Sequence, residues 1–260
     1  MTGAGAFYDV VRLESHRSGD GATDPTPPVL GTVPTITRRV SGSSRRFATD
    51  DTAASVRDVR GALQVFGDRA HPFRLTLSSM ALGAGASFVA IQLARSFATA
   101  GYRTLLVDGD VHRGTLHREV GATRRPGLTD YLRGDSTATR VVRPTSQRGL
   151  SFIACGKRVP NASALLGGPA LVALLSQIEA DFDIVLCDSA PFTAGADPFV
   201  LGARTGHLLV VLRSGVSPRA AADAAYAWHE SVPVDLLGVV ITRAPLSTTA
   251  VDRGPELLRD

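Results

Sequence analysis

The sequence lacks the features that insert a protein into a membrane or send it across one. No apolar run reaches the roughly 18 residues that a membrane-spanning helix requires. The first residues, MTGAGAFYDVVRLESHRSGDG, do not place a basic stretch before an apolar one, which is the pattern of a secretory leader. We therefore expect a cytoplasmic protein that reaches the inner membrane only through a partner.

Cysteine is also scarce, with only Cys155 and Cys187 in 260 residues. Two thiols in a chain of this length provide neither a disulfide framework nor the ligand set of a structural zinc site. Cys187 falls within the apolar run FDIVLCD. We therefore expect both thiols to be buried core side chains.

Lysine occurs once, as Lys157, although lysine and arginine together number 28. Arginine therefore carries almost all of the positive charge, and the net charge is +4. This balance is compatible with nucleic acid, anionic lipid or an acidic partner, and it selects none of them. A solvated, arginine-rich surface is the simpler explanation.

Composition divides the chain into a tail, a domain and a second tail. Residues 1–50 hold DPTPP and TRRVSGSSRR and lack apolar periodicity, which predicts a flexible N-terminal tail. The apolar patch VLGTVP at 29–34 interrupts this tail and is predicted to dock on the domain. We place the domain at residues 51–245, beginning with a helix over 51–66, and a polar C-terminal tail at 246–260.

Apolar runs alternate with helical stretches through the domain. Continuous runs of Leu, Val and Ile are typical of strands that are buried on both faces. The predicted strands are Arg74–Ser78, Thr104–Asp108, Leu150–Ala154, Asp183–Asp188, Leu208–Arg213 and Leu236–Ile241. The predicted helices between them are Ser87–Ala100, Leu128–Leu132, Ala162–Ala180, Pro198–Ala203 and Pro218–Glu230. This order predicts an α/β fold with a doubly wound, mostly parallel sheet and helices on both faces.

A glycine-rich turn, SSMALGAGASF, joins the first predicted core strand to a helix. Its glycines allow a tight turn, and successive N–H groups at the start of the helix can then form an anion-binding nest. A working phosphate-binding loop carries lysine directly before Ser or Thr, but here Ala86 precedes Ser87. Such turns are common, so this pattern alone is weak. The predicted nucleotide-binding residues of the loop are Gly83, Ala84, Gly85, Ala86, Ser87 and Phe88.

Aspartates stand at the ends of two further predicted strands. Asp108 and Asp110 would point to one side if the strand geometry continued, and such a pair could hold magnesium-bound water or accept a proton. Alternatively, Asp108 caps a turn and Asp110 is exposed. Asp188 ends the run FDIVLCD, where nucleotide-binding proteins carry a magnesium-side aspartate, although a single strand-ending aspartate is more often a turn residue. Three strand ends in this order favour a magnesium–nucleotide site.

Longer segments give a specific resemblance. Residues 28–244 resemble the cytoplasmic domain of bacterial tyrosine kinases (BY-kinases), which accompany polysaccharide co-polymerases in capsule and exopolysaccharide systems. The matching segments are VLGTVP, RDVR, PGLTDYLRG, ACGKRVPNASALLGGP, FDIVLCDSAPFTAGAD, HLLVVLRSGVSPR and LLGVVITRA.

The resemblance implies a fold, cofactors and site residues. It implies a P-loop NTPase fold of the MinD/ParA type that binds ATP or ADP with magnesium. Arg57 and Arg60 would lie in a helix that packs against a neighbouring subunit, which implies a homo-oligomer. Asp110 and Asp188 are the catalytic candidates, and Asp197 is a weaker, supporting one. The implied magnesium ligands are Ser87, Asp108, Asp110 and Asp188, with Asp108 also next to the nucleotide.

Several positions depart from the family's pattern. Ala86 replaces the P-loop lysine, Phe88 replaces a second hydroxyl, and Ala54 replaces the glutamate of the subunit-interface helix. The Arg-Arg-Pro that follows the paired aspartates becomes His-Arg-Gly at 112–114. Active members carry a tyrosine cluster at the C-terminus, whereas no tyrosine follows Tyr226 here.

Loss of the lysine bears on catalysis. Its phosphate contact and its charge in the transition state together correspond to roughly two to four orders of magnitude in the rate of phosphoryl transfer. The leading interpretation is a degenerate BY-kinase-like protein, weak or inactive as a kinase or ATPase. It would act as a regulatory scaffold partner of a membrane polysaccharide co-polymerase in exopolysaccharide synthesis and export, with no nucleic acid partner.

Besides a structural α/β module that binds no nucleotide, two alternatives stay open. One is an active but unusual tyrosine autokinase or ATPase of the same pathway, in which Arg113 reaches the phosphates. The other is a positioning ATPase of the MinD/ParA type, whose relatives usually carry an extra lysine at the start of the loop. Here Met80, Ala81 and Leu82 occupy that stretch.

Overall fold

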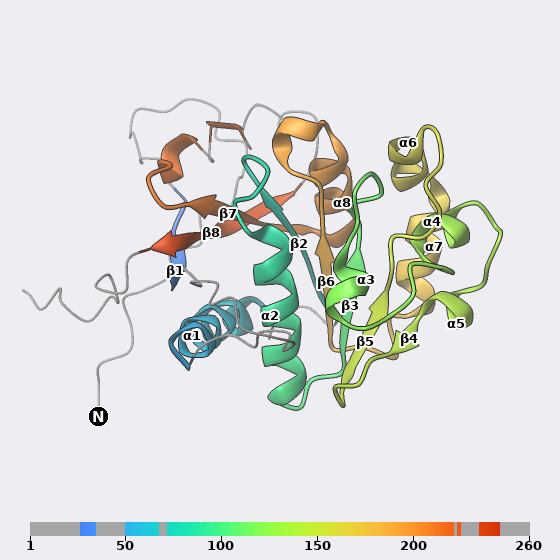
Figure 1. The fold of residues 1–260 in the computed structure, drawn as a ribbon, viewed down its shortest axis with the longest axis horizontal. Helices are drawn as coiled ribbons and strands as arrows, with labels where there is room; N and C mark the ends of the chain where they lie inside the picture. Colours follow the sequence, from blue (N-terminus) through green and yellow to red (C-terminus); the bar gives the residue numbers. More distant parts are fainter. Residues whose placement is uncertain (1–26, 35–49, 68–71, 221–222, 225–233, 245–260) are drawn as a thin grey trace, which may run out of the picture.

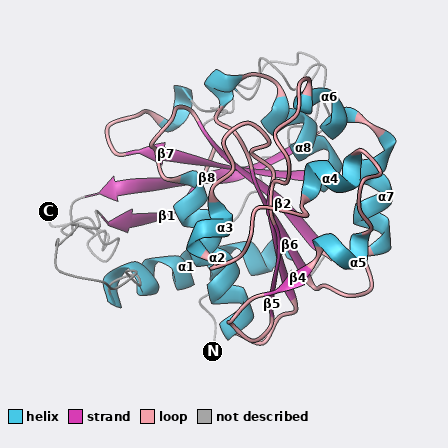
Figure 2. Cartoon of the chain, turned by 45° about the vertical axis from the view of Figure 1, so that its right-hand side comes forward, coloured by secondary structure: helices cyan, strands magenta, loops and turns pink. Residues whose placement is uncertain are grey.

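One twisted sheet organises the molecule (Figures 1 and 2). The computed structural model describes residues 27–34, 50–67, 72–220, 223–224 and 234–244. Within these residues, eight strands lie in the order β1-β8-β7-β2-β6-β3-β5-β4, and every pair is parallel except β4 with β5. This arrangement confirms the predicted α/β fold with a mostly parallel sheet.

The element bounds follow the predicted alternation closely. The strands are β1 (Val29–Pro34), β2 (Phe73–Ser79), β3 (Thr104–Asp108), β4 (Arg143–Pro144), β5 (Leu150–Ile153), β6 (Ile184–Asp188), β7 (His207–Arg213) and β8 (Asp235–Ala244). The helices are α1 (Asp50–Gly67), α2 (Ala86–Thr99), α3 (Leu116–Glu119), α4 (Leu128–Leu132), α5 (Ala138–Val141), α6 (Ala162–Gly167), α7 (Pro169–Gln177) and α8 (Asp197–Thr205), with a 3₁₀ turn, η1, at Phe192–Ala194.

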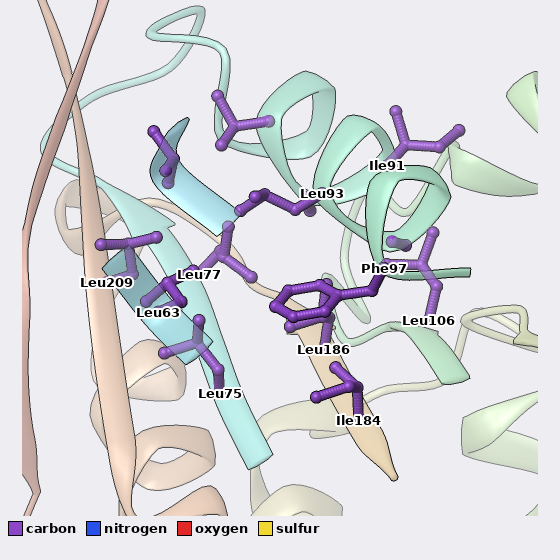
Figure 3. Packing of buried hydrophobic residues seen from close by; sticks show 14 of the residues in the cluster. Leu63, Leu75, Leu77, Ile91, Leu93, Phe97, Leu106, Ile184, Leu186 and Leu209 are labelled. Atoms are coloured by element: carbon purple, nitrogen blue, oxygen red, sulfur yellow. The ribbon is translucent and has the colours of Figure 1, made fainter. Parts of the chain in front are cut away.

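Alternate residues of the central strands enter different cores, because successive side chains of a strand point to opposite faces. In β3, Leu106 packs into the cluster that includes α1 and α2, whereas Leu105 and Val107 join the cluster under α4, α6 and α7. Figure 3 shows Phe97 of α2 lying close to Leu186 on the first of these faces. Helices therefore cover both faces, as predicted.

The apolar patch in the predicted N-terminal tail belongs to the sheet. β1 pairs in parallel with β8 along one edge, and Leu30 and Val33 are buried in the same core as α1. Residues 29–34, which were predicted to dock on the domain, do so as the edge strand β1. The rest of residues 1–49, apart from Pro27 and Pro28, lies outside the described residues, as do 245–260, so the two tails stay predictions.

One predicted helix divides into two. The stretch 162–180 forms α6 and α7, since Gly168 is extended at φ −73° and ψ 166° and Pro169 begins the second helix. The predicted helix at 218–230 lies largely outside the described residues. None of the described helices combines the length and the apolar character that crossing a membrane requires.

Candidate functional site

The glycine-rich loop joins β2 to α2 at the carboxyl edge of the sheet. Gly83 and Gly85 have φ values of 76° and 100°, a region that residues with a Cβ adopt rarely. Gly85 caps α2, and the carbonyl of Gly85 accepts the N–H of Val89 at 2.9 Å. The first turn of α2 contains no acidic side chain, so its N–H groups can face an anion.

Two buried carboxylates flank this loop. Asp108 and Asp188 are direct register partners at the ends of β3 and β6, and Leu77 of β2 is also opposite Asp188. Both side chains are buried, and one oxygen of each, Oδ1, has no hydrogen-bond partner among the described residues. The other oxygen of Asp108 accepts the N–H of Leu116 at 3.1 Å.

Burial sets the titration of these two groups. It raises the pKa of Asp108 to about 7, although the Leu116 N–H opposes the shift. Burial, followed by the charge of Asp108, raises the pKa of Asp188 well above its usual value, and interaction with the Ser87 side chain opposes that rise. Two enclosed carboxylates with free oxygens beside a hydroxyl form a donor set that suits magnesium. The predicted ligands Ser87, Asp108 and Asp188 therefore lie together.

Asp110 lies outside the strand. β3 ends at Asp108, so the extended geometry that would aim both aspartates to one side does not continue. Oδ1 of Asp110 accepts the backbone N–H of Arg113 at 2.8 Å and of His112 at 3.2 Å, which closes a turn. Its charge nevertheless raises the pKa of both Asp108 and Asp188, so it lies beside the site.

The two cysteines are buried and free, as predicted, and burial raises the pKa of each to about 12. Cys155 also accounts for one departure from the family's pattern. A Cβ on Gly114 would lie 2.5 Å from Sγ of Cys155 and 2.7 Å from Oδ1 of Asp108. The proline that the family carries at position 114 would therefore collide with both groups.

A histidine–aspartate contact adjoins the site, and the sequence did not reveal it. Nε2 of His112 lies 3.0 Å from Oδ2 of Asp197 and 3.1 Å from Oγ of Ser163. The Asp197 side chain is only 7% exposed. The contact ties the turn after β3 to α6 and α8.

The end of β8 attaches directly to the glycine-rich loop. The Thr242 hydroxyl lies against the carbonyls of Ala84 and Leu212, the latter at 3.1 Å. Nη2 of Arg243 donates to the carbonyl of Gly83 at 3.0 Å. Neither residue was predicted from the sequence, because the only signal of each is its place at the end of an apolar strand.

The arginines predicted at a subunit interface lie away from this site. Arg57 and Arg60 of α1 line a groove of about 370 Å³ with Arg95 and Thr99 near the carboxyl end of α2, whereas the glycine-rich loop lies at its amino end. Nε of Arg60 is enclosed and has no partner among the described residues. The interface role stays a prediction.

The fold and the site define a class. A glycine-rich loop between a buried strand and a helix, with strand-ending aspartates beside it, is the arrangement of a P-loop nucleotide-binding domain. No protein-family model matches the chain. The chain is 40% identical over 170 residues to a putative tyrosine-protein kinase, EpsB, of Ralstonia nicotianae, a match that covers 65% of this chain and 23% of that protein.

Solved structures extend the likeness to the whole domain. The BceF tyrosine kinase domain is 30% identical with a TM-score of 0.73, covering 84% of this chain and 94% of that one. The kinase domain of Escherichia coli tyrosine kinase ETK has a TM-score of 0.76 at 24% identity, covering 88% and 94%. The chain belongs to the bacterial tyrosine-kinase family. It spans about a quarter of the length of the curated relative that it matches.

Proposed function

We propose that this chain is a magnesium–nucleotide-binding member of its family that transfers phosphate slowly and works as a regulatory scaffold. Its partner would be a membrane polysaccharide co-polymerase in exopolysaccharide synthesis and export. The observation that carries the proposal is the combination of a retained carboxylate pair, Asp108 and Asp188, with Ala86 in place of the loop's lysine.

The binding half of the proposal rests on the residues around the loop. Ser87, Asp108 and Asp188 would hold magnesium, directly or through water, and the N–H groups at the start of α2 would receive the phosphates. When bound, the metal supplies positive charge that neutralises the phosphate oxygens. Asp110 is the candidate to orient the attacking hydroxyl or water, although its Oδ1 already holds the turn at 112–113.

The proposed slow transfer of phosphate rests on a missing positive charge in the loop. Ala86 is buried at the first position of α2 and offers a backbone N–H but no cation. Charge that stabilises only the transition state raises the rate of the chemical step, so its loss lowers turnover more than binding. Arg113, considered as a substitute, is exposed and meets Asp110 through its backbone N–H.

The part of the proposal that concerns the partner rests on family membership. The chain matches 23% of the length of the EpsB relative. A cytoplasmic domain of this kind would reach the inner membrane through the co-polymerase, and nucleotide would regulate the contact.

The test compares the wild type with Ala86→Lys. Calorimetry with Mg–ATP and Mg–ADP is expected to show binding by both proteins. Phosphotyrosine formation and ATP hydrolysis are expected to be near background in the wild type and roughly 100-fold or more faster in the variant. Rapid tyrosine autophosphorylation by the purified wild type would refute the scaffold role.

An active autokinase or ATPase is the second candidate, because the carboxylates of a catalytic site are all present. It requires a measurable wild-type rate that Asp110→Ala abolishes. Asp135→Ala is the matched control, since Asp135 is exposed and pairs with Arg133 away from the loop. A rate that is equal in both variants would exclude Asp110 as the catalytic group.

A further inference from the structure

Arg243 places a guanidinium group on the glycine-rich loop. Its Nη2 donates to the carbonyl of Gly83 at 3.0 Å, and the adjacent Thr242 contacts the carbonyl of Ala84. Both contacts join the carboxyl end of β8 to the loop across about 160 residues of sequence. The tertiary structure therefore brings Arg243 to the loop.

The backbone at Arg243 is unusual. Its φ is 57°, and Asn161 is the only other described residue besides glycine with a positive φ. A residue with a long side chain adopts this left-handed conformation rarely, and it persists only where the surroundings hold it. Here the hydrogen bond to Gly83 and the buried Thr242 beside it provide that support.

A cavity of about 370 Å³ lies beside the same contact. Pro34 of β1, Gly85 of the loop, Phe88 of α2 and Arg243 line it, and none of the described residues that line it is acidic. Its size lies in the range of small-molecule pockets. Arg243 supplies the lining's charge and Phe88 supplies an aromatic ring, the two kinds of group that stack on nucleobases and attract anionic ligands.

We propose that Arg243 binds the nucleoside side of the nucleotide in this cavity. The inference rests on the proposed nucleotide binding. Arginine suits the role because one N–H is committed to Gly83, while the exposed guanidinium keeps further donors and a planar face. With Ala86 in the loop, the site would still bind nucleotide but would lack the cation directed at the transferred phosphate.

The effects of Arg243 and of a lysine at position 86 can be distinguished. Arg243 would contact the nucleoside, which ATP and ADP share, so its loss weakens the binding of ATP and of ADP by the same factor. A lysine at position 86 points to the terminal phosphates, so it favours ATP over ADP. The ratio of the two affinities therefore tells which cation is acting.

The experiment measures Kd for Mg–ATP and Mg–ADP by calorimetry on the wild type, Arg243→Gln, Ala86→Lys and the double variant. Arg243→Gln is expected to weaken both nucleotides about tenfold. Ala86→Lys is expected to strengthen ATP more than ADP, and the double variant to keep that preference at lower affinity. Arg118→Gln is the control, because Arg118 is exposed on α3. This variant is expected to bind both nucleotides as tightly as the wild type.

Two results would overturn the inference in different ways. If Arg243→Gln binds as tightly as the wild type, Arg243 has no role and the proposed function still stands. If neither the wild type nor Ala86→Lys binds nucleotide, both proposals fail. Should Arg243→Gln unfold, Arg243→Lys decides the matter, because it keeps the charge but loses the planar face. Its affinity is then expected to fall severalfold, equally for ATP and ADP, and wild-type affinity would overturn the inference.

Discussion

At the scale of the residue, the carboxyl group of Asp108 makes the stability of the metal-free protein depend on pH. Burial raises its pKa to about 7, whereas the same group in the unfolded chain titrates near pH 3.9. Between these values the folded state binds more protons, so stability falls as pH rises from about 4 to 7. Asp108→Asn removes the buried charge. It is expected to raise Tm at pH 8 by about 4–8 °C in EDTA, with little change at pH 5.

Scanning calorimetry checks this, with Asp58→Asn as the control because Asp58 is exposed on α1. Magnesium is expected to raise the Tm of the wild type at pH 8, because the cation offsets the repulsion between Asp108 and Asp188. The same metal should have a smaller effect on Asp108→Asn. Equal Tm values for variant and wild type at pH 8 would mean that Asp108 is ionised without cost in the folded protein.

At the scale of the element, β1 adds a segment that precedes the domain's first helix to the edge of the sheet. Leu30 and Val33 are buried, and a Cβ on Gly31 would lie 2.5 Å from Cγ2 of Val59, so α1 packs tightly over the strand. Burying two such side chains corresponds to about 3–6 kcal/mol. Deleting residues 1–34 is therefore expected to lower Tm well below that of a chain lacking residues 1–26.

The comparison of these two truncations isolates the eight residues 27–34, and thermal unfolding followed by circular dichroism measures it. The larger deletion also removes one wall of the cavity beside Arg243, so nucleotide affinity should fall with stability. If both truncated chains melt at the same temperature, β1 contributes nothing to the fold and the edge of β8 stands without it.

The same elements show how far sequence reasoning reaches. Strand β3 was predicted to the residue, because a continuous buried run has few alternatives. The sequence also contains a signal for the break before Pro169, namely two glycines followed by a proline. The helical pattern on either side nevertheless predicted one continuous helix. The contact between His112 and Asp197 could not be predicted from the sequence, because the two residues are 85 positions apart and only the fold brings them together.

The site shows the same division. Asp108 and Asp188 were predicted as neighbours because parallel strands end at one edge of the sheet. The turn that redirects Asp110 depends on where β3 stops, and the contact of Arg243 depends on a left-handed backbone. Neither is a pattern of residue types. Local sequence therefore predicted which residues stand at the strand ends, and only the tertiary structure placed Arg243 against the glycine-rich loop.

At the scale of the whole molecule, the groove between α1 and α2 is an uncompensated basic surface. Arg57, Arg60 and Arg95 line it, its described lining contains no acidic residue, and Ala54 stands where the family carries a glutamate. Guanidinium groups this close together repel one another, so an acidic group from another molecule would stabilise them. Because the groove lies at the far end of α2 from the glycine-rich loop, that molecule need not contact this chain's own nucleotide.

If the groove is a subunit interface, the wild type is expected to show a mass above the 27.2 kDa monomer at high concentration and low salt. Light scattering after size exclusion measures this. Arg57→Glu with Arg60→Glu should return the mass to that of the monomer, whereas Arg118→Glu on α3 should not. High salt should act like the double variant, because screening weakens contacts between charges. Assembly that survives both treatments would place the interface elsewhere, and the groove would then have to meet a different acidic protein.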